Sequence, residues 1–413
     1  MKRSAITPKL RFSEFLEDWK AVTVGDFFDL TDKAEKAETF EKDKLLTVRL
    51  HANGVVKNEK TTLTGGANYF KRNAGQFIFS KIDLLNGAFG IVPDELDSFA
   101  SSSDVPAFSF GTNQSPLFFL NWLKSSYQRI DVERTGTSST LKRVSPEAFL
   151  AVEISAPTKA EQQKIAECLS TLDELIGAES QKLDALKAHK KGLMQQLFPR
   201  EGETLPRLRF PEFQDAPEWE ETTIGAIGRF YYGKSAPKWS LAADAPTPCV
   251  RYGELYTTFD AVITKTYSRT NIDPSNLRFS KGGEILVPRV GEKPEDFGKC
   301  CCFLPLAGIA IGEMISVFET DQSPLFYTYY FRNLYRQFAK VVEGQNVKNL
   351  YYTELEPLPI YKPTNLLEQQ RIAACLSSLD DLIAAQSDQI EVLKTHKKGL
   401  MQQLFPSPAE GAA

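Results

Sequence analysis

The strongest constraint on this chain is an internal repeat. Residues 189–199, which read His-Lys-Lys-Gly-Leu-Met-Gln-Gln-Leu-Phe-Pro, recur without a single change as residues 396–406. The offset is 396 − 189 = 207 residues, about half of the 413-residue chain, and it also relates Glu161-Gln162-Gln163 to Glu368-Gln369-Gln370. Two copies of one pattern predict a covalent pseudo-dimer, which can offer two similar surfaces to a partner of near two-fold symmetry.

Each half of the chain is expected to end in a long helix. Within residues 158–199 and 364–406, apolar residues recur at alternating intervals of four and three, which is typical of a coiled-coil seam. Polar residues interrupt this seam at Glu179 and Lys190 and at the matching places of the second copy, where such residues commonly fix register and orientation. The apolar seam residues are Ile165, Leu169, Leu172, Ile176, Leu183, Leu186, Leu193 and Leu197, and then Ile372, Leu376, Leu379, Ile383, Ile390, Leu393, Leu400 and Leu404.

The ends of both helices can be predicted. Thr158 with Glu161, and Asn365 with Glu368, have the spacing of a capping box, and a proline follows the last turn of each helix. Each helix would then be about 60 Å long at 1.5 Å per residue. Because a large domain must return the chain between them, we expect the two helices to pack on one another in antiparallel orientation.

The regions before the helices are expected to be rich in β-structure. They contain many Phe, Val, Ile, Thr and Tyr residues with frequent Gly, Pro, Asn and Asp, which favours short strands and turns. The predicted fold class is α+β, with two β-rich domains, an antiparallel coiled coil and an internal pseudo-two-fold repeat. The predicted parts are an N-terminal segment 1–19, a first domain 20–157, a helix 158–199, a linker 200–219, a second domain 220–363, a helix 364–406 and a tail 407–413.

Composition argues against several classes of protein. The six cysteines include no CxxC pair and the chain has only three histidines, so we expect neither a disulfide framework, nor a metal site, nor a histidine-based catalytic site. We see no secretory signal and no membrane span, and we expect a reducing cytoplasm. The net charge is −4, and both β-rich regions hold nearly equal numbers of basic and acidic residues, so any nucleic-acid surface must be local.

One motif indicates a different function. Residues 228–235, Gly-Arg-Phe-Tyr-Tyr-Gly-Lys-Ser, satisfy the GxxxxGK[ST] pattern of a phosphate-binding loop. Such a loop lies between a buried strand and a helix, whereas here three aromatic residues fill it and Pro237 follows closely. We therefore expect no nucleotide there.

Taken together, the motifs resemble the specificity subunits of type I restriction–modification systems. The resemblance covers essentially the whole chain. Its most specific parts are Pro157-Thr158 with Glu161-Gln162-Gln163, Pro363-Thr364 with Glu368-Gln369-Gln370, and the two Lys-Gly-Leu-Met-Gln-Gln-Leu-Phe-Pro helix ends.

The resemblance implies a protein that recognises DNA and performs no chemistry. In that family the two globular parts are target recognition domains, each of which reads one half of a split double-stranded site. The helices set the spacing between them and dock two modification subunits, and restriction subunits join through these. The partners would bind S-adenosylmethionine, Mg²⁺ and ATP, whereas this chain would hold no cofactor. The half-sites would lie about one helical turn apart, roughly 34–36 Å.

Candidates for DNA contact are polar or basic residues on turns between strands. Gln and Asn suit adenine edges, Lys and Arg suit guanine or phosphate, and small hydroxyls can serve either. In the first domain these are Arg49, Lys71, Arg72, Lys81, Thr137, Ser138, Ser139, Lys142 and Arg143. In the second domain they are Arg251, Tyr252, Arg289, Gln345, Asn346, Lys348 and Asn349. The alternative for each is an ordinary exposed polar residue.

Two other functions stay open from the sequence. A coiled-coil scaffold with two protein- or glycan-binding heads would show no salt-dependent affinity for DNA. An NTPase would use Gly228 to Ser235. Lys190-Lys191 and Lys397-Lys398 are either solvated helix ends or contacts to DNA or a partner subunit.

Overall fold

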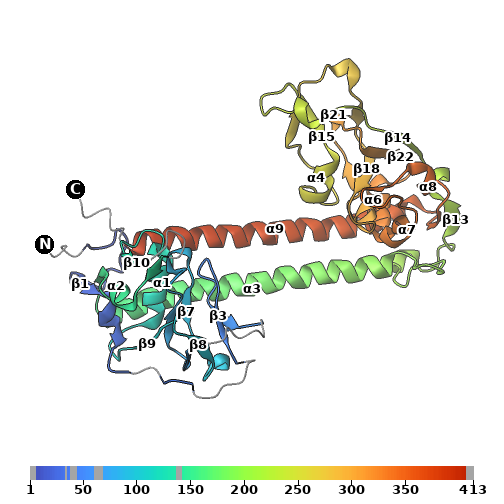
Figure 1. Ribbon diagram of the computed structural model, residues 1–413. Helices are drawn as coiled ribbons and strands as arrows, with labels where there is room; N and C mark the ends of the chain where they lie inside the picture. Colours follow the sequence, from blue (N-terminus) through green and yellow to red (C-terminus); the bar gives the residue numbers. More distant parts are fainter. Residues whose placement is uncertain (1–5, 33–34, 38–43, 60–67, 136–141, 406–413) are drawn as a thin grey trace. The chain divides into compact units, whose positions relative to one another are not determined.

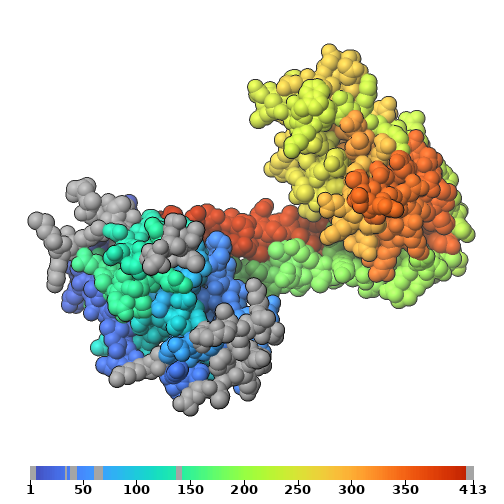
Figure 2. All heavy atoms as spheres, in the orientation of Figure 1, coloured from blue at the N-terminus to red at the C-terminus, as the bar shows by residue number. Residues whose placement is uncertain are grey.

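The computed structural model describes residues 6–32, 35–37, 44–59, 68–135 and 142–405 (Figure 1). By the packing of its Cα atoms the chain forms two compact units. Unit 1 comprises residues 1–180 and 388–413, and unit 2 comprises residues 181–387. Figure 2 shows the same elements with all heavy atoms, coloured along the chain. The boundary between the units falls inside both long helices, so each unit contains part of each helix.

The two long helices are α3 (Lys159–Leu197) and α9 (Leu366–Leu404). Within unit 1, the start of α3 and the end of α9 share one core, to which Ile165 and Leu169 contribute from α3 and Leu404 from α9. Unit 2 contains the reciprocal arrangement, with Leu197 of α3 and Ile372 of α9 in one core. The start of one helix packs beside the end of the other in each unit, so the helices are antiparallel.

The β-rich part of unit 1, here called head 1, is closed by its first and last strands. Strand β1 (Lys20–Thr23) pairs antiparallel with β12 (Glu153–Ala156), in the register Lys20 to Ala156. The central sheet has the order β2-β9-β6-β7 and is built from Phe28–Asp29, Ala107–Phe110, Phe77–Phe79 and Phe89–Ile91. Three strand pairs surround it: β3–β4 (Leu46–Val48, Val55–Lys57), β5–β8 (Tyr69–Lys71, Ala100–Ser102) and β10–β11 (Arg134–Thr135, Arg143–Val144). The helices are α1 (Pro116–Ser126), α2 (Pro146–Leu150) and the short 3-10 turns Val24–Phe27, Leu84–Asn86 and Asp94–Leu96.

Head 2, the β-rich part of unit 2, repeats this plan with a second sheet added. Strand β13 (Glu220–Thr223) pairs antiparallel with β24 (Pro359–Lys362). The first sheet, β14-β22-β18-β20, is built from Arg229–Tyr232, Ile315–Glu319, Glu284–Pro288 and Cys302–Leu304. The second, β16-β15-β21-β17, is built from Ser268–Thr270, Thr247–Val250, Ala307–Ile311 and Phe279–Lys281, with β15 and β21 parallel. A further pair is β19–β23 (Val290–Gly291, Lys348–Asn349). The helices are α4 (Tyr252–Thr257), α5 (Asp296–Lys299), α6 (Pro324–Asn333), α7 (Tyr335–Lys340) and α8 (Tyr352–Leu355), with 3-10 turns at Pro211–Phe213, Ile224–Ala226, Lys238–Ser240 and Pro274–Asn276.

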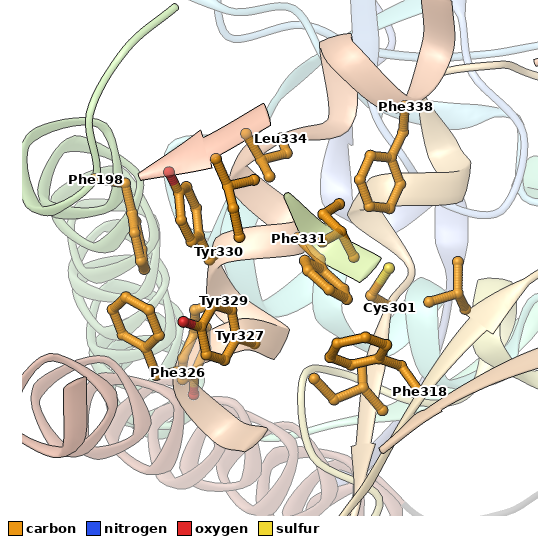
Figure 3. Packing of buried hydrophobic residues seen from close by; sticks show 14 of the residues in the cluster. Phe198, Cys301, Phe318, Phe326, Tyr327, Tyr329, Tyr330, Phe331, Leu334 and Phe338 are labelled. Atoms are coloured by element: carbon orange, nitrogen blue, oxygen red, sulfur yellow. The ribbon is translucent and has the colours of Figure 1, made fainter. Parts of the chain in front are cut away.

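An aromatic core joins each head to the end of a long helix. In unit 2 the ring of Phe198, directly after α3, stacks on Tyr330 with centroids 4.9 Å apart and lies 5.4 Å from Phe326 (Figure 3). In unit 1 the ring of Phe405, directly after α9, lies 5.4 Å from Phe118. Because aromatic residues bury large apolar areas and prefer tilted or offset contacts, the repeated Leu-Phe-Pro segments anchor the helix ends in the heads.

The repeated Glu-Gln-Gln motif ties each long helix to the segments around it. The buried carboxylate of Glu161 accepts two hydrogen bonds from the Arg11 guanidinium, at 2.7 and 2.8 Å, and one from the Trp19 indole at 3.2 Å. Gln162 accepts a hydrogen bond from the main-chain N–H of Ser115 at the start of α1, at 3.0 Å. The Glu161 carboxylate is therefore used to bind Arg11 and Trp19, and not to form the predicted capping box.

Unit 2 makes the same contacts with the second copy of the motif. Glu368 binds Arg209 twice at 2.7 Å and Trp219 at 3.2 Å, and Gln369 accepts a hydrogen bond from the N–H of Ser323 at 3.1 Å. These bonds also raise the pKa of the Arg209 guanidinium. The Glu-Gln-Gln motif is thus a structural clamp that the repeat uses twice.

Candidate nucleic-acid interface

In head 2 the candidate residues from separate parts of the sequence lie close to Arg289. This residue stands between β18 and β19, and β19 pairs with β23, which places Val290 opposite Asn349. The N–H of Leu350 donates to the carbonyl of Arg289 at 2.9 Å. The strand-end candidate and the Gln345–Asn349 candidates therefore lie side by side.

Arg251 and Tyr252 border the same region. They line a cavity of about 260 Å³ together with Val290, residues 235–238 and residues 312–314. The N–H of Arg289 donates to the carbonyl of Met314, which is one of these lining residues, at 3.0 Å. Three candidate groups that are far apart in the sequence thus converge on one surface of head 2.

The loop that carries Gln345 and Asn346 has its own internal order. Its turn begins at Gly344 with a φ of 97°, where an added Cβ would lie 2.3 Å from the carbonyl oxygen of Val347. The ammonium of Lys348 donates to the carbonyl of Gly344 at 2.6 Å, so this candidate is partly engaged by its own loop. The side chains of Gln345 and Asn346 are exposed.

The Arg289 guanidinium lies between two tyrosine rings. Its carbon is 4.4 Å from the ring centroid of Tyr232 and 5.4 Å from that of Tyr351. Its Nε atom is buried and has no hydrogen-bond partner. Burial raises the pKa of Tyr232 although the nearby guanidinium opposes this shift, so the phenol stays neutral. The sequence did not reveal the two tyrosines, because nothing in their spacing marks them as neighbours of Arg289.

Head 1 repeats the strand-end geometry with different side chains. The N–H of Val144 donates to the carbonyl of Lys81 at 2.8 Å, and the N–H of Lys81 donates to the carbonyl of Asp104 at 2.9 Å. Arg143 lies beside this strand end and its guanidinium is 3.5 Å from the Asp104 carboxylate. Lys142 is exposed. The candidates Thr137, Ser138 and Ser139 lie outside the described residues.

The remaining candidates of head 1 lie elsewhere, and one of them is wrong. Arg72 is only 2% exposed, and its guanidinium donates to Ser101 Oγ at 2.7 Å and to the Val105 carbonyl at 2.9 Å, so it serves the core of head 1 rather than its surface. Burial also lowers the pKa of Arg72. Lys71 is 3.8 Å from the carboxylate of Glu35. Arg49 is exposed and directly follows β3, as Arg251 follows β15.

The phosphate-loop motif of residues 228–235 is a strand. Residues Arg229–Tyr232 form β14, which pairs with β22. An added Cβ would lie 2.3 Å from the carbonyl oxygen of Glu319 at Gly228, and 2.0 Å from that of Gly312 at Gly233. Close strand packing therefore accounts for both glycines, and the extended backbone between them cannot curl its amides around a phosphate.

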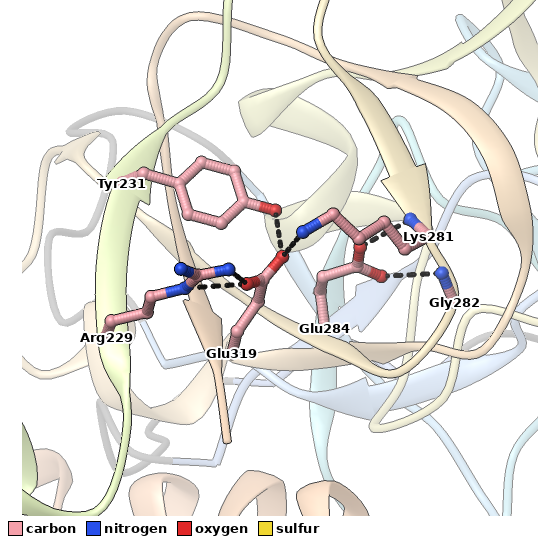
Figure 4. Close-up of polar contacts among 6 residues, drawn as sticks. All are labelled: Arg229, Tyr231, Lys281, Gly282, Glu284 and Glu319. Atoms are coloured by element: carbon pink, nitrogen blue, oxygen red, sulfur yellow. Dashed lines mark hydrogen bonds and ion pairs between the residues drawn. The ribbon is translucent and has the colours of Figure 1, made fainter. Parts of the chain in front are cut away.

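The basic residues beside this strand are already paired. The Glu319 carboxylate binds Arg229 at 2.5 Å, Lys281 at 2.8 Å and the Tyr231 hydroxyl at 3.1 Å (Figure 4). Arg229, Lys281 and Glu319 border a cavity of about 850 Å³. Burial alone would raise the pKa of Glu319, but the hydrogen bonds from Lys281 and Arg229 outweigh it and lower the pKa. Since the cavity's cations are neutralised internally, it offers little attraction to an anion.

The long helices carry a seam in which both lysines, Lys190 and Lys397, form ion pairs. All sixteen predicted apolar seam residues are buried or half-buried. Lys190 pairs with Asp380 in unit 2, and Lys397 pairs with Asp173 at 2.5 Å in unit 1, at positions related by the 207-residue offset. The aspartates were not among the predicted seam residues, although Leu172-Asp173 and Leu379-Asp380 repeat visibly. The Lys190 and Lys397 side chains are thus engaged within the coiled coil.

The described residues contain neither a cluster suited to a metal ion nor a membrane-spanning helix. Across those ranges, no group of three or more His, Cys, Asp or Glu side chains is placed to hold a metal ion. Nor does the described part of the chain include a helix long and apolar enough to cross a membrane.

The sequence matches one family model over well over half of its length. The model is that of the type I restriction modification DNA specificity domain, and it matches residues 16–188 and 303–395. The chain is 25% identical over 302 residues to the type I restriction enzyme MjaVIII specificity subunit of Methanocaldococcus jannaschii, covering 70% of this chain and 68% of that protein. It is 26% identical over 263 residues to the MjaX specificity subunit of the same organism, covering 62% of this chain and 58% of that protein.

Solved structures share the fold. The S subunit of a type I restriction–modification system from M. genitalium superposes with a TM-score of 0.56 at 16% identity, covering 97% of this chain and all of that one. A chain from a structure of complex assembly and conformational transition in a type I R-M system gives a TM-score of 0.59 at 15% identity, covering 96% of this chain and all of that one.

Proposed function

The chain belongs to the family of DNA specificity subunits of type I restriction–modification systems, and from this premise we propose that it selects a bipartite DNA target. Head 1, within residues 20–157, reads one half-site, and head 2, within residues 220–363, reads the other. The chain performs no chemistry and binds no cofactor. It acts in the cytoplasm with two methyltransferase subunits, which supply S-adenosylmethionine, and with restriction subunits that supply ATP-driven cleavage with Mg²⁺.

One observation carries the assignment of the reading surface. In both heads a basic residue at a strand end, Lys81 or Arg289, accepts a main-chain hydrogen bond from the residue that ends the candidate loop, Val144 or Leu350. The repeat therefore presents an equivalent strand end twice, each time bonded to the residue that follows the candidate loop, as a split target requires. Side chains at such loop tips can reach base edges, while phosphate contacts hold register.

The docking of two partner subunits is supported by the outer faces of the helices. Relative to the seam, one side of each unit's helix pair has a patch of six residues without Asp, Glu, Lys or Arg, and this patch includes exposed apolar side chains, with Leu175 42%, Leu382 54% and Val392 62% exposed. In unit 1 this face consists of Thr171, Leu175, Ala178, Val392, His396 and Gly399. In unit 2 it consists of Ser378, Leu382, Ala385, Ala185, His189 and Gly192, which are the same positions after the 207-residue offset. Small residues beside an exposed leucine suit the close approach of another protein's surface.

Exchange of one head tests the reading assignment. Residues 220–363 are replaced by the equivalent domain of another specificity subunit, and the methylated sites of the assembled complex are mapped across a genome. We expect one half of the target to change and the other to remain. A change in both halves, or in neither, would contradict one reader per head. DNA affinity that does not fall as salt rises would instead favour a scaffold that binds proteins or glycans.

Single substitutions on the helix faces test docking. Leu175→Glu and Leu382→Glu should each reduce the number of bound methyltransferase subunits from two to one, and the double variant should bind none. Glu174→Lys is the control, because it changes charge next to Leu175 on the opposite, charged side of α3. Mass photometry of the mixed subunits gives the stoichiometry directly. Full binding by the double variant would place the docking surface elsewhere.

The spacing role of the helices can be tested by insertion. We propose that α3 and α9 set the distance between the half-sites. One added heptad in each helix, at residues 180 and 387, keeps the seam in phase and lengthens both helices by about 10 Å. The preferred spacer should grow by about three base pairs, since each pair adds roughly 3.4 Å. An unchanged spacer would show that another element sets the distance.

A further inference from the structure

The guanidinium of Arg289 is unusual in what it lacks. Elsewhere in head 2, Arg229 is bound by the carboxylate of Glu319, and Arg269 donates to the carbonyls of Ala245 and Pro246. Arg289 has no carboxylate partner and no hydrogen-bond acceptor for its side chain among the described residues, and its Nε is closed off from solvent. A charged group with several donors is costly to leave unpaired, so its persistence here points to an acceptor that arrives from outside.

Two tyrosine rings lie against this guanidinium, with centroids 4.4 Å and 5.4 Å from its carbon. Tyr232 belongs to β14, where it pairs with Ser316 of β22, and its ring lies 4.6 Å from that of Tyr352. Tyr351 immediately precedes α8, and the main chain of Arg289 is bonded on both sides, to Met314 and to Leu350. Rings on anchored elements hold the planar cation by stacking and by attraction to the ring faces. Its orientation is therefore set before any partner binds.

This orientation leaves the outer edge of the guanidinium available. Nε is buried while the residue as a whole keeps part of its surface exposed. The two terminal amino groups at the outer edge form a fork of parallel donors. The exposed Gln345 and Asn346 extend from the loop that ends beside Arg289, which places this edge on the surface that the proposed function assigns to DNA.

We propose that Arg289, aligned by Tyr232 and Tyr351, reads a guanine in the half-site bound by head 2. Its terminal amino groups donate to O6 and N7 of that base in the major groove, a pairing that only guanine offers. Arg289 is the residue that determines specificity at this base pair, and the two tyrosines are positioning residues. The inference rests on the proposed function, because it names one base contact of the same surface.

A fixed plane favours a base over a phosphate as the acceptor. A guanidinium fork can also bind a phosphate with two hydrogen bonds, but phosphate oxygens accept from many directions, so a phosphate contact needs no fixed plane. Bidentate recognition of O6 and N7 instead requires a coplanar fork, which the tyrosines supply. The equivalent position of head 1 is Lys81, whose ammonium can donate to guanine but has no planar fork. A contact oriented by a planar fork is therefore expected only in the half of the target bound by head 2.

The test compares base preference with total affinity. The full chain, assembled with its modification subunits, selects from a library of random DNA duplexes, and the bound sequences are read for the wild type, Arg289→Lys and Arg289→Ala. For the wild type we expect one guanine in one half-site. Both variants should lose preference at that position by about 10- to 100-fold, with the other half-site unchanged, and Arg289→Lys should keep most of the salt-dependent affinity.

Two tyrosine variants separate positioning from folding. Tyr351→Phe keeps the ring and should keep the guanine preference, whereas Tyr351→Ala should weaken the preference more than it weakens total affinity. If Arg289→Ala does not fold, the base preferences of Arg289→Lys and Tyr351→Ala still test the proposal. A uniform loss of affinity across all sequences, with a salt slope smaller by about one, would identify a phosphate contact and overturn the proposal. Unchanged preference in Arg289→Lys would overturn it as well. A wild type with no sequence preference at all would instead contradict the proposed function.

Discussion

Removing the buried negative charge of Glu368 should destabilise unit 2 more than removing the charge of an exposed glutamate. The Glu368 side chain is 1% exposed, and it accepts two hydrogen bonds of 2.7 Å from Arg209, whose side chain is 11% exposed. Substitution Glu368→Gln keeps the shape but leaves the guanidinium without a counter-charge. Removing one partner of a buried pair typically costs about 3–5 kcal/mol. Because Arg209 keeps its bonds to the carbonyls of Ala216 and Pro217, we expect the lower end of that range, about 3 kcal/mol.

The control is an ion pair in the same unit. Arg371 and Glu212 lie 3.1 Å apart, with side chains 54% and 48% exposed. An exposed pair contributes about 0–1 kcal/mol, because water screens the charges and both side chains lose conformational freedom. Glu212→Gln should therefore change the stability of unit 2 by less than about 1 kcal/mol.

Hydrogen exchange followed by mass spectrometry measures both effects locally. A loss of about 3 kcal/mol corresponds to roughly a 150-fold faster exchange of amides that open with unit 2, such as those in the first turns of α9. Head 1 should exchange as in the wild type, and Glu161→Gln should produce the converse pattern. Equal effects of Glu368→Gln and Glu212→Gln would refute the reasoning. They would show that burial does not determine how much the ion pair of Glu368 contributes to the stability of unit 2.

Three further predictions concern head 2. Gly233→Ala should destabilise head 2 by several kcal/mol or prevent its folding, because the new Cβ would lie 2.0 Å from a main-chain oxygen. The control Gly253→Ala in α4 has open space around the new Cβ and should raise the melting temperature slightly. Calorimetry should find the same ATP binding for Lys234→Ala as for the wild-type chain. A loss of binding in this variant would support the phosphate-loop interpretation. The lowered pKa of Glu319 means that its stabilising contribution is present above the ordinary pKa of 4.5 and is lost as the pH falls through the folded-state value. Wild type and Glu319→Gln should therefore differ in melting temperature at pH 7 and converge once the pH has fallen below the folded-state pKa of Glu319, and a constant difference would contradict this linkage.

The long helices show why some of this structure could be predicted from the sequence. A seam depends only on local spacing, so Ile165 to Leu197 and Ile372 to Leu404 identify the buried face without knowledge of the partner. The predicted bounds, 158–199 and 364–406, lie within two residues of those observed.

Residues whose role depends on distant partners could not be predicted in this way. The spacing of Glu161 suits a capping box, but its carboxylate is used by Arg11, 150 residues away in the sequence. Arg72 follows a strand and precedes a polar turn, as a surface residue would, yet the pairing of β5 with β8 buries it against Ser101. The convergence of Arg251 with the loop at Gln345 likewise depends on sheet topology, which no local pattern encodes.

The uneven strength of the repeat follows from what each segment contacts. The identical helix ends have equivalent surroundings: Phe198 lies 5.4 Å from Phe326, and Phe405 lies 5.4 Å from Phe118, a residue 208 positions earlier than Phe326. Lys190 and Lys397 likewise meet aspartates that are themselves related by the offset. A substitution in either copy would break an equivalent close-packed contact. The loss of stability is therefore similar in both copies. In head 2 the loop beside Arg289 instead exposes Gln345 and Asn346, and two heads that read different half-sites, as proposed, would need different side chains there. The segments that fix the frame therefore match letter for letter, while those at the proposed reading surface diverge.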